Sequence, residues 1–135
     1  MSAFTTACLP PEALELAPDG SECRPLVRLA GASLAHFRLA AGTCSRAVMH
    51  CSVEEIWYVL AGRGALWRRQ DGREQVVALV AGVSVTIPLG TAFQFRAATG
   101  AALEFVAVTL PPWPGDGEAL AVDGPWPASL PGADA

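Results

Sequence analysis

The stretch RAVMHCSVEEIWYVLAGRG, residues 46–64, contains the side chains best suited to chemistry. His50 is followed five positions later by Glu55, at the start of a strand-like apolar run. An imidazole changes its charge near neutral pH and binds metals, and a carboxylate beside it can orient the ring or exchange a proton with it. The pair therefore predicts two ligands of a metal site, a catalytic acid–base pair, or two polar side chains that only satisfy each other.

Alternation along a strand selects the side chains that would share a site with this pair. Neighbouring strand residues point to opposite faces, so Cys51 is expected to face away if His50 faces inward. Arg46 shares the His50 face, where its guanidinium is suited to holding a carboxylate or phosphate through two parallel hydrogen bonds. A surface arginine at the start of the strand is the alternative. The apolar residues expected on the same face as the pair are Val48, Trp57 and Val59.

Strand-like segments surround this stretch on both sides. Apolar and polar residues alternate in VSVTIPLG, AFQFRAA and LEFVAVTL. Glycine and Asp-Gly turns separate such runs about every 8–12 residues. This rhythm predicts an all-β sandwich or barrel over residues 27–110.

The two ends of the chain differ from this central part. Residues 1–26 are expected to form a partly irregular N-terminal arm. Residues 111–135 are rich in proline and contain acidic side chains but no basic ones, which predicts an irregular acidic tail. Trp113 and Trp126 are large apolar anchors in this tail, so we expect it to pack on the barrel or on a partner subunit.

Composition and charge limit the function classes. A chain of 135 residues with 52% hydrophobic and 16% charged residues is expected to form one globular domain. The net charge is −4, and the nine basic residues, all arginine, are balanced by acids over residues 1–110. The sequence therefore predicts neither a nucleic-acid partner nor an anionic membrane partner.

The location is expected to be cytoplasmic. The N-terminal residues lack the basic start and apolar run of a secretory signal, and no apolar run approaches the ~20 residues that span a bilayer. The four cysteines show no C-x-x-C spacing, which predicts free thiols in a reducing compartment.

Residues 42–62 resemble the first motif of the cupin superfamily, in which a glycine precedes two histidines, a glutamate and a second glycine at fixed intervals. The segment GVSVTIPLGTAFQFRA is similar to the second cupin motif. The resemblance implies a double-stranded β-helix, the jelly-roll barrel of cupins, in agreement with the strand pattern. The matching residues are Gly42, His50, Glu55 and Gly62 in the first motif and Gly82, Pro88 and Gly90 in the second.

The metal ligands of the two motifs are incomplete in this chain. Cupins typically bind a metal through two histidines and the glutamate of the first motif and a histidine of the second. Val48 and Phe93 stand at two of those histidine positions. A catalytic metal usually needs about three protein ligands, and His50 with Glu55 supply two. We therefore expect no metal or other cofactor, and a divalent metal, if bound, would use these two residues.

The same alignment implies a more apolar pocket than a metal cupin has. Val48 and Phe93 would line it, together with Phe95, which shares the Phe93 face. We expect an unidentified small organic ligand, with His50 and Glu55 as the polar floor. The alternatives are a metal-dependent isomerase, epimerase or oxygenase with an unusual ligand set, and a structural or regulatory barrel without chemistry. The resemblance also implies a homodimer, since exposed sheet edges need covering.

Overall fold

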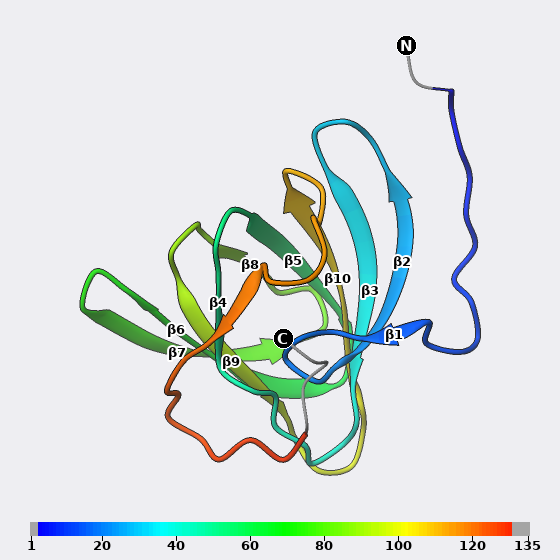
Figure 1. Cartoon of the computed structure of the whole chain (residues 1–135). Helices are drawn as coiled ribbons and strands as arrows, with labels where there is room; N and C mark the ends of the chain where they lie inside the picture. Colours follow the sequence, from blue (N-terminus) through cyan, green and yellow to red (C-terminus); the bar gives the residue numbers. More distant parts are fainter. Residues whose placement is uncertain (1–2, 131–135) are drawn as a thin grey trace.

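The computed structural model describes residues 3–130 and arranges eleven strands in two antiparallel sheets that face each other (Figure 1). The first sheet runs, in order of pairing, β1 (Glu15–Leu16), β2 (Glu22–Arg28), β3 (Ser33–Leu39), β10 (Leu103–Leu110), β5 (Glu54–Ala61) and β8 (Ser84–Ile87). The second runs β11 (Ala119–Ala121), β4 (Val48–His50), β9 (Ala92–Ala97), β6 (Arg63–Gln70) and β7 (Arg73–Val80). The all-β prediction is confirmed.

Strand β5 shows why the alternating sequence forms a two-layer structure. It buries Glu55, Trp57 and Val59 between the sheets and exposes Ile56 and Tyr58 on the outer face. Its neighbour β10 alternates in the same way along its whole length. A period of two places one face of each strand against the core, so the register between these strands fixes which side chains meet inside.

Stacked aromatic rings form the centre of the core. The rings of Trp57 and Phe105 stack with centroids 4.0 Å apart, and Phe95 packs edge-on against both at 5.1 and 5.4 Å. Burial of each such side chain stabilises the fold by roughly 1.5–3 kcal/mol. This cluster therefore holds the middle of the two sheets together and fixes the orientation of Trp57.

Gly62 turns the chain from β5 into β6 at a place where no side chain fits. Its φ angle is 84°, in the left-handed region. A Cβ atom built there would overlap the backbone carbonyl of Ala102. The last glycine of the first motif is thus explained by both conformation and close backbone approach.

The C-terminal tail packs on its own barrel. The Gln94 side chain donates to the carbonyl of Trp126 (2.8 Å) and accepts from the Trp126 amide (3.1 Å), which buries the outer face of β9. The guanidinium of Arg96 lies 4.1 Å from the centre of the Trp126 ring. Strand β11 adds the tail to the second sheet through β4. The last five residues of the expected tail, 131–135, lie outside the described residues.

The barrel begins earlier than the expected boundary at residue 27. Strand β2 starts at Glu22 and pairs with β3, so this boundary falls within a strand. Pro25 has no amide hydrogen, and the register of β2 shifts between Pro25 and Arg28. Such an interrupted strand lacks the regular alternation that marks β5 and β10.

Residues 3–14 form an extended arm outside the first sheet and lead away from the barrel (Figure 1). The Arg24 guanidinium donates to the carbonyls of Pro10 and Pro11, both at 3.0 Å, and ties the arm to β2. Phe4 and Leu9 in this arm are exposed. Within residues 3–130 there is no helix of the length and hydrophobicity needed to cross a membrane.

Candidate functional site

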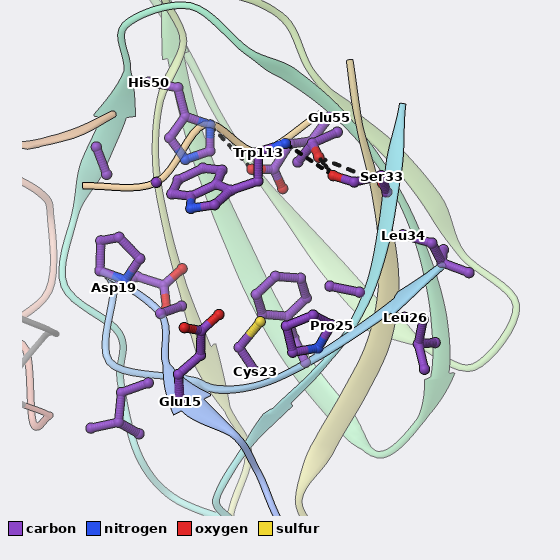
Figure 2. Close-up of a pocket in the computed structure, with 18 of the residues that line it drawn as sticks. Glu15, Asp19, Cys23, Pro25, Leu26, Ser33, Leu34, His50, Glu55 and Trp113 are labelled. Atoms are coloured by element: carbon purple, nitrogen blue, oxygen red, sulfur yellow. Dashed lines mark hydrogen bonds and ion pairs between the residues drawn. The ribbon is translucent and has the colours of Figure 1, made fainter. Parts of the chain in front are cut away.

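His50 and Glu55 meet between the two sheets. His50 ends β4 and Glu55 lies at the start of β5, and the turn between them brings their side chains to the same end of the barrel (Figure 2). The Nδ1 atom of His50 lies 3.1 Å from Oε2 of Glu55, and the two side chains are only 6% and 7% exposed. The structure thus brings the predicted pair together in a buried position.

Aromatic side chains hold both members of the pair. The indole N–H of Trp57 donates to Oε1 of Glu55 at 2.7 Å. The imidazole of His50 is packed edge-on against Phe93 and Trp113, with ring centroids 5.3 and 5.2 Å away. Although Nδ1 of His50 is close to Glu55, it makes no aligned hydrogen bond within the described residues. The ring is therefore fixed by packing, and its nitrogen keeps unused hydrogen-bonding capacity.

Burial keeps both groups uncharged at neutral pH. Desolvation raises the pKa of Glu55 to about 8, and the nearby charges of Asp19 and Glu118 raise it further against the opposing hydrogen bond from Trp57. Desolvation lowers the pKa of His50 to about 4, although the charge of Glu118 opposes this. At pH 7 the site thus holds a protonated carboxyl, which can donate, and a neutral imidazole, which can accept.

A cavity of about 560 Å³ lies against the pair. Figure 2 shows His50, Glu55 and Trp113 at one end, with Glu15 and Cys23 toward the other. Its aromatic walls come from the first sheet and the tail: Phe37, Trp57, Phe105 and Trp113. This volume suits a small organic molecule, because typical ligand pockets measure roughly 300–1,000 Å³.

The other predicted site residues fall into two groups. Trp57 lines the cavity as well as bonding to Glu55. The apolar residues at the replaced ligand positions and their neighbours are buried in the hydrophobic core and are not among the cavity-lining residues: Val48, Val59, Phe93 and Phe95. Of these four, Phe93 packs edge-on against the His50 ring.

Arg46 is half-buried and does not line the cavity. It precedes β4, which begins at Val48. Alternation assigns faces only within an extended strand, so the parity that links Arg46 to His50 does not hold there. Its backbone amide instead donates to the carbonyl of Asp19 at 2.8 Å.

Several cavity residues lie outside residues 46–64, the segment that contains His50 and Glu55. Asp19 lies in the turn before β2, and Trp113 comes from the tail. Ser33 of β3 and Thr109 of β10 line the cavity and are hydrogen-bonded to each other, and the Trp113 amide donates to the Ser33 hydroxyl at 3.0 Å. Strand parity predicts the inward side of β10, but nothing local in the sequence brings the tail to the barrel mouth.

The residues present do not fit a catalytic metal. Among the described residues, no group of three or more histidine, cysteine, aspartate or glutamate side chains is arranged to hold a metal ion. The two missing ligand positions are packed apolar side chains, so no neighbouring donor replaces them. His50 and Glu55 alone fall short of the three ligands that such a site usually needs.

Comparison with known families gives a match over most of this barrel. The family model of the Cupin domain matches residues 35–109, more than half of the chain. A search among curated proteins gave no match.

Solved structures with the same fold include three bacterial proteins. One from Klebsiella pneumoniae, described as an uncharacterized conserved protein with a double-stranded β-helix domain, is 14% identical with a TM-score of 0.64, covering 82% of this chain and 90% of that one. One from Bacillus halodurans is 19% identical with a TM-score of 0.63, covering 78% and 79% of the two chains. One from Thermotoga maritima, described as a predicted oxalate decarboxylase, is 23% identical with a TM-score of 0.57, covering 67% and 80%. At these identities the likeness concerns the fold alone, and it confirms the predicted double-stranded β-helix.

Proposed function

The chain belongs to the cupin family, and from this premise we propose that it binds a small organic molecule in the cavity beside His50 and Glu55. The observation that carries the proposal is a buried ionisable pair at the end of a cavity of about 560 Å³, whose imidazole Nδ1 makes no aligned hydrogen bond to any residue that the structure describes. A buried polar group without a partner costs stability, so a site that keeps one is better explained by a ligand than by packing.

The pair gives the cavity one polar end and a capacity for proton transfer. The protonated carboxyl of Glu55 can donate to a ligand oxygen or nitrogen, and the neutral imidazole of His50 can accept. Burial raises the pKa of Glu55 to about 8. A general acid works best when its pKa lies near the working pH, so this value suits proton transfer in neutral solution. An isomerisation that moves a proton would need no further group for this step.

Binding is tested by titrating the protein with small organic compounds that differ in polarity, including benzyl alcohol. We expect a compound that fills the cavity to raise the melting temperature and to shift the NMR signals of Trp57 and Trp113. The Glu55→Gln variant should lose most of this response. Glu54→Gln is the matched control, because Glu54 is exposed on the same strand and points away from the core. If no small molecule stabilises the protein, or if both variants respond alike, the proposal fails.

We also propose that the chain forms a homodimer through the outer face of the first sheet. Ile56, Tyr58 and Leu60 are 49%, 49% and 45% exposed on this face of β5. The exposed arm of residues 3–14, with Phe4 and Leu9, lies outside the same sheet (Figure 1). A second copy would cover this apolar face and give the arm a surface to pack on.

A further inference from the structure

The charges around the cavity are mostly negative. Four of its lining side chains carry carboxyl groups: Glu15, Asp19, Glu55 and Asp116. Glu55 and Asp19 are buried, whereas Glu15 and Asp116 are exposed at the cavity's edge. The lining residues include a single arginine, Arg28, which is exposed as well. Any charged ligand therefore passes exposed acids and meets buried ones.

None of these acids is neutralised by a basic side chain within residues 3–130. Glu15, Asp19 and Asp116 take part in no salt bridge there, and the only basic group near Glu55 is the imidazole of His50. Asp19 is held in place by the amide and hydroxyl of Ser21, which donate to its Oδ1 at 2.9 and 2.6 Å. The position of Asp19 is thus fixed, and no cationic side chain lies beside either buried acid.

A second observation points to a ligand at this end of the cavity. His50 lines the cavity and is 6% exposed. Oε2 of Glu55 lies 3.1 Å from its Nδ1, yet this nitrogen makes no aligned hydrogen bond within residues 3–130. The imidazole, being neutral, cannot stabilise an anion by its charge. A bound group that donates hydrogen bonds would satisfy the imidazole nitrogen and would also reach the Glu55 carboxyl beside it.

We propose that the ligand of this cavity is an organic amine, with its ammonium group approaching both Oε2 of Glu55 and Nδ1 of His50 from the cavity side and its apolar part against the aromatic walls. The inference rests on the proposed function and names the class of ligand that the same site takes. The rings of Trp57 and Trp113 line this end of the cavity. An ammonium group that packs on the face of such a ring is held by a cation–π interaction.

Proton balance favours the same class. A neutral amine takes the proton from the Glu55 carboxyl and becomes an ammonium ion, while Glu55 becomes a carboxylate. An amine that enters as an ammonium ion displaces that proton to solvent. In both cases an ion pair with charge-assisted hydrogen bonds replaces the buried, uncharged carboxyl. A carboxylate or phosphate ligand would instead face Glu55 and Asp19 with no buried cation to balance it.

The test compares three compounds of the same shape: benzylamine, benzyl alcohol and benzoate. Calorimetric titration of the full chain is expected to give benzylamine a dissociation constant about tenfold lower than that of benzyl alcohol, the effect of one charge-assisted hydrogen bond. Benzoate is expected not to bind. Glu55→Gln should abolish the preference for benzylamine over benzyl alcohol, and Glu54→Gln should leave both affinities unchanged.

A second variant keeps the test valid if Glu55→Gln does not fold. Glu15 is exposed at the edge of the cavity, so Glu15→Gln leaves the core intact. It should weaken benzylamine several-fold and leave benzyl alcohol unchanged. Benzoate binding as tightly as benzylamine, or benzyl alcohol binding more tightly, would overturn the amine while leaving a small-molecule site in place. Binding of none of the three would overturn the proposed function together with this inference.

Discussion

Two opposing effects act on the pKa of the Glu55 carboxyl. Its burial favours the protonated form, while the indole N–H of Trp57 favours the charged form. Burial is the larger effect and sets the pKa at about 8. The residue is thus a buried acid whose charge changes near neutral pH, beside an imidazole held neutral by the same burial.

This raised pKa predicts a pH-dependent stability. The unfolded chain loses the Glu55 proton near the ordinary pKa of 4.5, whereas the folded protein retains it up to about 8. The contribution of Glu55 is therefore fully present below the unfolded pKa and is lost as the pH rises toward 8. Relative to the wild type, Glu55→Gln should gain on the order of 3 kcal/mol in free energy of unfolding between about pH 5 and pH 8. Urea unfolding at several pH values measures this, and the same pH profile for Glu55→Gln and Glu54→Gln would contradict it.

The two-donor site predicts weak metal binding. Protein purified without an affinity tag should contain less than about 0.1 equivalent of zinc, iron, nickel or manganese per chain, because a pair of ligands holds such ions poorly. Elemental analysis measures the content, with His50→Ala as comparison. Stoichiometric metal that disappears in His50→Ala would favour the metal-dependent alternative instead.

The sequence spacing is enough to predict that His50 and Glu55 meet, but it does not predict which residues surround them. His50 and Glu55 flank one short turn, so strand parity is enough to bring them together. Asp19 and Trp113 reach the cavity through long-range packing of the two ends of the chain, which leaves no periodic pattern. Arg46 shows the limit of parity, because its segment is not extended strand.

At the scale of the elements, the turn from β5 to β6 depends on Gly62. Gly62→Ala should cost more than about 3 kcal/mol, because the new Cβ atom overlaps the Ala102 carbonyl in addition to the conformational strain. Gly72→Ala is the matched control: its φ is 76°, yet nothing lies within 4 Å of a Cβ there, so only the strain of about 1–2 kcal/mol remains. Thermal unfolding of both variants measures the difference, and equal losses would show that the contact with Ala102 is unimportant.

Regular strands could be predicted, and irregular ones could not. The alternation in β5 and β10 is visible in the sequence and matches their burial. Pro25 interrupts the alternating pattern of β2, so the sequence does not mark it as a regular strand. Gln94 is a polar residue on the outer face of β9, where Trp126 covers it. The first difference comes from a local break in the strand at Pro25, and the second from a neighbour that is far away in sequence.

At the scale of the whole molecule, the proposed dimer predicts that charges on the outer face of β5 separate the subunits. The double variant Ile56→Lys/Tyr58→Lys should be monomeric, because it places four lysines in the symmetric interface. Val76→Lys is the control, since Val76 is exposed on β7 in the other sheet. Light scattering after gel filtration gives the mass, and a monomeric wild type at micromolar concentration would contradict the dimer.

The proposed function requires Glu55 to be a buried, protonated acid that lines a ligand cavity. An NMR titration of the Glu55 side-chain carboxyl carbon, with and without benzylamine, tests this directly. A midpoint near pH 8 is expected for the protein alone, and a clearly lower midpoint is expected once an ammonium group is bound. A midpoint near the ordinary 4.5, unchanged by the amine, would contradict it.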